Sequence, residues 1–263
     1  MDEGVPPPGA NVECGPTAEH RYPVVLVHGT FETTEQNWVE VSPRLKQECY
    51  RAPSTTATAG SVASAGRPTG SIFVDKVLDY TGAKNVFIVG HSQGGMMPRY
   101  WTKYLGGKGK VEDLVGFAPS KYGTNLGKAT SENPTAEDFN LPVENNPDGD
   151  KPCYSCDQQG VDSRFIRRLN AGDDTPGPGS FSQTATEDDE IIITFRDRFL
   201  RGTERTRDVI LQNYYRKYYE EIVVTHQNVC KDPVAQEFML DALDKPGPVN
   251  PDRAPENFEL PPP

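Results

Sequence analysis

The chain lacks any long apolar run. None of its hydrophobic stretches approaches the ~20 residues that a helix needs to cross a bilayer, and residues 1–8 lack the basic and apolar regions of a signal peptide. Positive charge is also scarce, because 27 Lys and Arg stand against 38 Asp and Glu, a net charge of −11. This balance argues against nucleic acid or an anionic membrane surface as a partner. We expect no integral membrane association, and a protein that is secreted with its signal removed or, alternatively, cytoplasmic.

Cysteine is the second scarce residue type, with five in the chain. A zinc site would need a second cysteine pair or histidines at ligand spacing, and neither is present. Cys153 and Cys156 form a lone C-x-x-C in a polar segment, without the strand-to-helix context of a thioredoxin-like redox motif. Disulfide bonding in an oxidising compartment is the preferred interpretation, with one cysteine left over. A bridge between Cys14 and Cys49 would pin the N-terminal arm, but the sequence does not fix the pairing.

Apolar, strand-like runs alternate with helical patterns along the chain. This alternation predicts an α/β fold with a doubly wound, mostly parallel sheet flanked by helices. Strands are predicted at 21–27, 85–90, 114–118, 181–186 and 208–212, and helices at 37–48, 72–81, 96–105 and 233–243. The expected domain organisation is an N-terminal arm at 1–20, one α/β domain at 21–244 with a polar insertion at about 128–180, and a disordered proline-rich tail at 245–263.

One segment carries a specific chemical signal. The strand-like run at 85–90 leads into a Gly-His-Ser-Gln-Gly motif at 90–94, and a helix-compatible segment follows. This order is typical of a nucleophile elbow, in which a serine stands on a tight turn between a strand and a helix. The motif alone is a weak pattern, and a Gly- and Ser-rich turn of another α/β protein is the simpler alternative. Its position between strand and helix makes Ser92 the candidate nucleophile.

A serine hydroxyl needs a base to take its proton and an acid to orient that base. The chain offers only four histidines. His20 lies in the N-terminal arm, His28 follows the first strand, and His91, inside the elbow, is expected to point away from the serine's partner. His226 remains, and it follows Ser92 as the order Ser, Asp, His requires. Its alternative role is an ordinary histidine of the surface or core.

The acid is expected between the serine and the histidine, at the end of a strand. Residues 186–190 meet this condition and contain Asp188 and Asp189, which the residues alone do not separate. The alternative for the whole acidic cluster is a solvated loop. The less favourable acidic candidates are Asp197, and Asp173 and Asp174 in what looks like a solvated turn.

The turn after the first strand is the candidate oxyanion site. A glycine at position 29 lets the backbone approach a ligand, so this turn can present an N–H group to a substrate carbonyl. The donor from the turn is Thr30 or Phe31, between which the sequence does not choose. The N–H of Gln93, directly after the nucleophile, would be the second donor. The supporting residues are His28, Gly29 and His91.

Several segments together resemble the lipase class 2 family of secreted bacterial lipases and esterases: Pro23 to Phe31, Asn37-Trp38, Val89 to Tyr100 and Leu169 to Gly177. The resemblance runs, with gaps, from about Cys14 to Leu243. It implies an α/β-hydrolase that cleaves carboxylic esters of acylglycerols or short synthetic esters without a cofactor or metal. It also implies lipid degradation with a catalytic triad, a small-molecule or lipid ester as partner, and transient contact with a lipid interface.

Site residues carry over position by position. The nucleophile of the family falls on Ser92. Its acid lies in an Ala-Thr-x-x-Asp-Glu segment that matches 185–190, which favours Asp189 over Asp188. Its base stands a few residues before an Asp-Pro helix start, consistent with His226. The C-x-x-C of the family also has a counterpart here.

Three features depart from the family pattern. The family has an apolar strand where 51–66 shows no apolar run, so one sheet strand is expected to be missing or weak. Residues 121–124 read Lys-Tyr-Gly-Thr instead of Asn-His-Gly-Thr, which predicts the loss of a polar contact near the site. Residues 214–221 are rich in tyrosine and charge. These changes bear on stability and activity more than on the fold class.

The predicted function is a serine hydrolase that cleaves carboxylic esters through an acyl-serine intermediate. Residues 128–150, where a lid would lie, are polar, which favours an esterase or a lipase for short chains. Acyl transfer to an alcohol other than water would use the same residues. The alternative from another class is a catalytically impaired, hydrolase-like protein that only binds a small acyl or other ligand.

Overall fold

The computed structural model describes residues 6–11, 20–50, 69–124, 154–192, 199–219 and 221–253. Within these residues, five strands form one parallel sheet in the order β1-β2-β3-β4-β5. The strands are β1 (Val24–Val27), β2 (Val86–His91), β3 (Val111–Phe117), β4 (Ser180–Ala185) and β5 (Thr206–Ile210). Each predicted strand overlaps one of them, and the predicted parallel α/β sheet is confirmed. The weak strand expected at 51–66 lies outside the described residues.

The first strand shows why these segments form a sheet covered on both faces. Val24 and Leu26 belong to one core cluster, whereas Val25 and Val27 belong to another. Successive side chains of a strand point to opposite faces, so an unbroken apolar run fits a strand that is buried on both sides. All four residues of β1 are buried.

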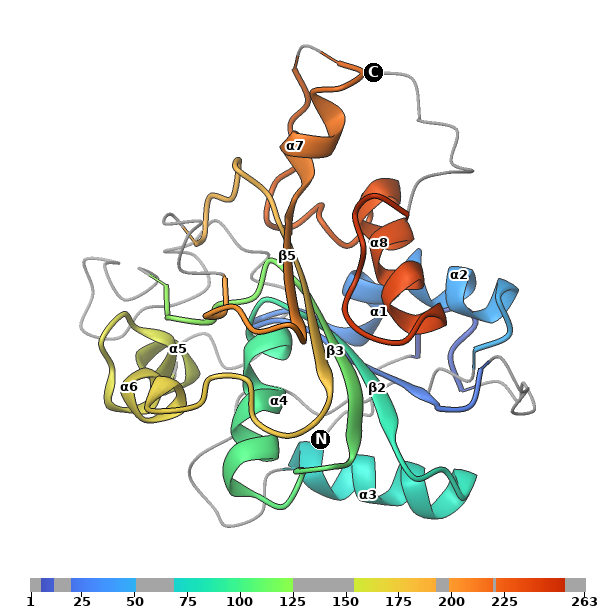
Figure 1. Cartoon of the computed structure of the whole chain (residues 1–263), viewed down its shortest axis with the longest axis vertical. Helices are drawn as coiled ribbons and strands as arrows, with labels where there is room; N and C mark the ends of the chain where they lie inside the picture. Colours follow the sequence, from blue (N-terminus) through green and yellow to red (C-terminus); the bar gives the residue numbers. More distant parts are fainter. Residues whose placement is uncertain are drawn as a thin grey trace.

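Helices cover the two faces, as the doubly wound arrangement requires (Figure 1). The core cluster of Val24 and Leu26 includes residues of α1 (Thr34–Trp38), α2 (Val41–Gln47) and α8 (Pro233–Asp244). The other cluster includes residues of α3 (Thr69–Thr81) and α4 (Gln93–Tyr104). Three short helices that we did not predict complete the described set: α5 (Tyr154–Gln159), α6 (Arg164–Asn170) and α7 (Leu211–Tyr215).

The single helix predicted at 37–48 is two helices. Thr33 starts the first of them with a capping box, because its hydroxyl accepts from the Gln36 N–H and its own N–H donates to the Gln36 side chain. Pro43 would remove a hydrogen bond from the middle of one continuous helix. In the structure it falls instead in the first turn of α2, where proline is tolerated.

The chain after α8 is packed further than predicted. We expected disorder from residue 245, but Val249 is buried and its N–H donates to Ser182 Oγ at 2.9 Å. Arg253 forms an ion pair with Asp241 of α8, with 3.1 Å between Nε and Oδ1. The Val249 contact therefore holds this segment to β4 and the charge pair holds it to α8, and 254–263 lie outside the described residues.

The bridge that we considered between Cys14 and Cys49 is not formed, because Cys49 is exposed and free. Cys230 is also free, and it is buried. Cys156 is buried and disulfide-bonded, and Cys14 and Cys153 lie outside the described residues. No helix in the described part of the chain combines the length and apolarity needed to cross a membrane.

Candidate functional site

Ser92 stands on a strained turn between β2 and α4. Its backbone has φ 52° and ψ −119°, a conformation that residues with a Cβ rarely adopt. The flanking glycines permit this turn: a Cβ on Gly90 would lie 2.1 Å from the Gly94 carbonyl oxygen, and one on Gly94 would lie 2.0 Å from the Val27 oxygen. The crowding expected of a nucleophile elbow is therefore present in the structure.

Asp189 and His226 meet in the interior beside this turn. Asp189 Oδ2 lies 3.0 Å from His226 Nδ1, and both side chains are almost fully buried. The other carboxylate oxygen, Oδ1, accepts from the N–H groups of Ile191 at 3.0 Å and Ile192 at 2.7 Å. These two bonds fix the carboxylate and leave Oδ2 for the imidazole. The arrangement holds the ring with Nδ1–H towards the acid and Nε2 available to take a proton.

Asp188 has a different set of contacts. Its Oδ2 accepts from Gln212 Nε2 at 2.8 Å and from the Val224 N–H at 3.2 Å, so it ties the acidic loop to the segments around it. We expected Asp174 in a solvated turn, but it is buried and accepts from the Tyr122 hydroxyl and the Arg201 N–H. Asp197 lies outside the described residues. Among the described acids that we considered, Asp189 is the one in contact with His226.

The His28-Gly29 turn packs directly against the elbow. A Cβ on Gly29 would lie 3.1 Å from Ser92 Cβ and only 2.1 Å from Glu32 Oε2, so a larger residue there would displace the Glu32 carboxylate. The Gly29 N–H donates to Asn37 Oδ1 at 2.9 Å, which fixes the turn from α1. His28 is buried, and its Nδ1 lies 2.8 Å from the Gly29 oxygen.

A chain of polar side chains joins this turn to Gln93, the residue after Ser92. Ser120 donates to Gln159 Oε1 at 2.9 Å, Gln159 Nε2 donates to Thr30 Oγ1 at 2.8 Å, and Thr30 donates to Gln93 Oε1 at 3.0 Å. Because Thr30 Oγ1 accepts from the amide, its own proton is directed to Gln93. Phe31, the other candidate donor of the turn, has φ 58°. We did not predict Gln159, since it lies on a short polar helix with no local signal.

His91 lies against His226, although we had expected it to point away from the serine's partner. Its Nε2 lies 2.9 Å from the carbonyl oxygen of His226, and the two ring centroids are 4.7 Å apart. Its Nδ1 lies 2.7 Å from Glu32 Oε2, another residue that we missed. Glu32 stands four positions after His28 in a turn, where a carboxylate has no distinguishing pattern.

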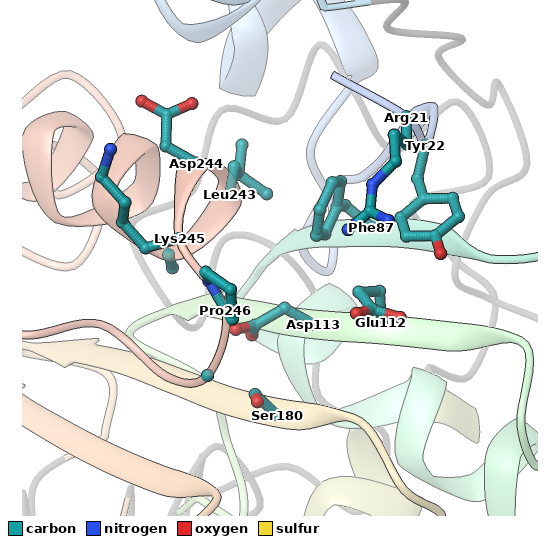
Figure 2. Close-up of a pocket in the computed structure, with 12 residues that line it drawn as sticks. Arg21, Tyr22, Phe87, Glu112, Asp113, Ser180, Leu243, Asp244, Lys245 and Pro246 are labelled. Carbon is teal, nitrogen blue, oxygen red and sulfur yellow. The ribbon is translucent and has the colours of Figure 1, made fainter. Parts of the chain in front are cut away.

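A hollow of about 90 Å³ lies at the opposite end of the sheet (Figure 2). Figure 2 shows Arg21 and Glu112 on one side and Lys245 and Pro246 on the other, with Asp113 between them. Its lining comes from the amino ends of β1 to β4 and from the end of α8 with the residues that follow it, whereas Ser92 follows the carboxyl end of β2. It is therefore separate from the candidate site. Across the described part of the chain, no cluster of three or more His, Cys, Asp or Glu is arranged to hold a metal.

The Lys121 side chain, one of the departures from the family pattern, is fully buried behind the elbow. Its Nζ donates to the Gly95 carbonyl oxygen at 3.1 Å. Burial, and then the charge of Arg99, hold the pKa of Lys121 well below its ordinary value of 10.5. A base whose pKa is lowered by folding destabilises the folded state below its unfolded pKa, and the penalty grows as the pH falls towards the folded pKa.

We expect Lys121→Met to raise the free energy of unfolding at neutral pH by about 1–3 kcal/mol, since an amine that loses its hydration on folding is replaced by an apolar chain of similar length. The gain should shrink as the pH approaches 10.5, where the unfolded lysine also loses its proton. Urea denaturation across this pH range measures it. The matched control is Lys110→Met, which removes a half-exposed lysine paired with Asp75. A loss of stability at neutral pH would contradict the prediction.

Lipases are among the known proteins that this chain resembles in sequence and structure. A triacylglycerol lipase of Burkholderia plantarii is 34% identical over 101 residues, which are 35% of this chain and 28% of that protein. The aligned segment thus spans less than a third of that curated relative. Lipase B of Aspergillus fumigatus superposes with a TM-score of 0.74 at 19% identity, covering 93% of this chain and 57% of that one. The mature form of the Bacillus licheniformis lipase BlEst2 superposes with a TM-score of 0.61 at 14% identity, covering 90% and 97%.

The two structural likenesses establish the fold, which is that of the α/β-hydrolases, as predicted. The sequence model of the family described as lipase (class 2) matches residues 69–238, which include Ser92, Asp189 and His226. Because this match covers more than half of the chain, the protein belongs to the class 2 lipase family.

Proposed function

We propose that this protein hydrolyses carboxylic esters through an acyl intermediate on Ser92. The observation that carries the proposal is the buried Asp189–His226 pair, with 3.0 Å between Oδ2 and Nδ1, beside a serine in a strained turn. Structural ion pairs are common, but this one lies beside a nucleophile elbow, with the His226 ring 4.7 Å from that of His91, in a chain of the class 2 lipase family. The combination favours acyl transfer over a role in stability alone.

In the first half of the reaction, His226 Nε2 takes the proton of the Ser92 hydroxyl as Oγ attacks the ester carbonyl. The negative charge that develops on the carbonyl oxygen is stabilised by two backbone N–H groups. We assign them to Gln93 and Thr30, because the Thr30 side chain contacts the Gln93 side chain and holds the turn against the elbow. The protonated His226 then gives its proton to the departing alkoxide, which leaves as the alcohol.

In the second half, His226 takes a proton from water as the water oxygen attacks the acyl-serine. The acid is released, and the proton returns to Ser92 Oγ. Asp189 stays ionised throughout and stabilises the imidazolium formed in each half. It is held by the Ile191 and Ile192 N–H groups, so it needs no rearrangement during the reaction.

The proposed substrates are acylglycerols or short-chain esters, in line with the named activity of the Burkholderia plantarii relative. A secreted enzyme is part of this proposal, and the disulfide at Cys156 supports an oxidising compartment. The polar segment at 128–150, our candidate lid, lies outside the described residues. We therefore keep short acyl chains as the proposed preference on composition alone.

The proposal is tested by treating the protein with a fluorophosphonate probe and locating the label by peptide mass spectrometry. We expect one label, on Ser92, because an activated serine forms a covalent adduct that an ordinary serine does not. Turnover of p-nitrophenyl esters from acetate to palmitate then gives the chain-length preference. A folded protein that takes no label and turns over no ester would overturn the proposal and leave the ligand-binding alternative.

A further inference from the structure

A second carboxylate–imidazole pair lies under the elbow, outside the proposed triad. Glu32, in the turn after β1, places Oε2 2.7 Å from Nδ1 of His91, the last residue of β2. The His91 side chain is completely buried and that of Glu32 is 8% exposed. The same Glu32 oxygen accepts from the Gly29 N–H at 3.1 Å, so the pair also touches the candidate oxyanion turn.

Both ring nitrogens of His91 face acceptors. Nδ1 faces the Glu32 carboxylate, and Nε2 faces the His226 carbonyl oxygen at 2.9 Å. A neutral imidazole carries one N–H and satisfies only one of these acceptors, whereas an imidazolium satisfies both. Asn37 Nδ2, 3.3 Å from Nδ1, is a donor and fits beside the carboxylate rather than competing with it. The geometry therefore calls for a charged His91.

The electrostatic surroundings agree with this assignment. Burial disfavours the charge on His91, but the charge and hydrogen bond of Glu32 outweigh it, and Asp189 adds to them, so the pKa of His91 is raised. Burial alone would raise the pKa of Glu32. The charge and hydrogen bond of His91 outweigh this effect, with a further contribution from the charge of His226, so the pKa of Glu32 is lowered. The groups that face the pair are thus the Gly29 N–H, Asn37, Asp189, His226 and the Cys230 thiol.

His226 is consequently held at three points. Its imidazole is held by Asp189, its N–H donates to Glu190 Oε2 at 2.8 Å, and its carbonyl accepts from His91. The His91 contact joins the loop of His226 to β2, whose last residue directly precedes Ser92. We propose that Glu32 and His91 are positioning residues: Glu32 keeps His91 charged, and His91 fixes the main chain of His226 relative to the nucleophile.

This inference rests on the proposed function for its catalytic consequence, but its structural part stands apart from it. A displacement of about 1 Å at a reacting group lowers turnover by about 100-fold. His226 follows residues 221–225, which form neither helix nor strand. The hydrogen bond from His91 therefore sets the distance between His226 and Ser92. Loss of that anchor should affect the chemical step and leave substrate binding intact.

The test uses Glu32→Gln, which keeps the size of the side chain and removes its charge. We expect kcat for p-nitrophenyl butyrate to fall about 10- to 100-fold, with KM within about twofold of the wild-type value. The matched control is Asp75→Asn, which removes the carboxylate of an ion pair with Lys110 at the surface, also 2.7 Å long. It should leave both constants unchanged.

NMR of protein labelled with ¹⁵N-histidine separates positioning from a loss of folding. At about pH 7.5, above the ordinary pKa of 6.5 at which a histidine has lost half its charge, His91 should carry protons on both ring nitrogens in the wild type and on one in Glu32→Gln. The His226 carbonyl carbon should shift in the variant, while circular dichroism stays that of the wild type.

Two results would overturn the inference: a singly protonated His91 in the wild type, or unchanged kcat and an unchanged His226 carbonyl signal once that proton is lost. If even the wild type turns over no ester, the proposed function fails. In that case the NMR signals of the His91 ring and the His226 carbonyl still test whether Glu32 and His91 hold the main chain of His226.

Discussion

Hydrolysis of p-nitrophenyl esters is expected to fall by about 10⁶-fold in kcat when Ser92 is replaced by alanine, and by about 10⁴-fold when Asp189 is replaced by asparagine. Without the serine hydroxyl there is no acyl intermediate, and only the oxyanion donors and substrate binding remain. Asparagine in place of Asp189 cannot stabilise the imidazolium. Its NH2 group can donate to Nδ1, which leaves the ring proton on Nε2, the wrong tautomer for a base. Steady-state and single-turnover kinetics measure both effects.

The neighbouring acid provides the matched control for this series. Asp188→Asn changes the adjacent residue of the same loop, but Asp188 contacts Gln212 and the Val224 N–H instead of the imidazole. We expect its kcat to stay close to the wild-type value, with a small loss of stability. Ser42→Ala, at a buried serine on α2, is the corresponding control for the nucleophile. An Asp188 variant as inactive as the Asp189 variant would contradict the assignment of the acid.

Substitution of Gly94 by alanine is expected to prevent folding. A Cβ at this position would lie 2.0 Å from the Val27 carbonyl oxygen and 2.7 Å from that of His28, and both belong to the backbone at the end of β1. Neither atom can move without separating β1 from β2. We expect a loss of more than about 4 kcal/mol, which belongs to the severe end of single substitutions and is comparable to the whole stability of a marginal domain.

The direction of this effect is the opposite of what helix propensity predicts. Gly94 lies in the first turn of α4, and alanine in a helix is more favourable than glycine by about 1 kcal/mol. Gly202→Ala is the control, because a Cβ there meets no atom within 4 Å. Soluble expression and urea denaturation of the two variants measure the difference. A Gly94→Ala protein with wild-type stability would show that the close approach between β1 and the elbow is wrong.

The local parts of the site could be predicted from the sequence. The apolar run before Ser92, the glycines beside it and the helix after it are neighbours in the chain, so one stretch of sequence contains all the information for the elbow. The start of α8 is equally local, since Asp232 caps the helix through the Ala235 N–H at 2.8 Å and Pro233 follows it. Such features depend on backbone geometry over a few residues, which residue type alone can specify.

The sequence by itself thus determined the parallel α/β fold, the position of Ser92 and the short list that contained Asp189 and His226. Only the tertiary structure decided which oxygen of the acidic loop faces the imidazole, and that Asp188 and Asp174 serve other contacts. It also decided that Glu32 and Gln159 lie at the site and that His91 faces the base. These partners are separated by 37 to 135 positions or lie in turns without pattern, and they meet because parallel strands bring their carboxyl ends to one edge of the sheet.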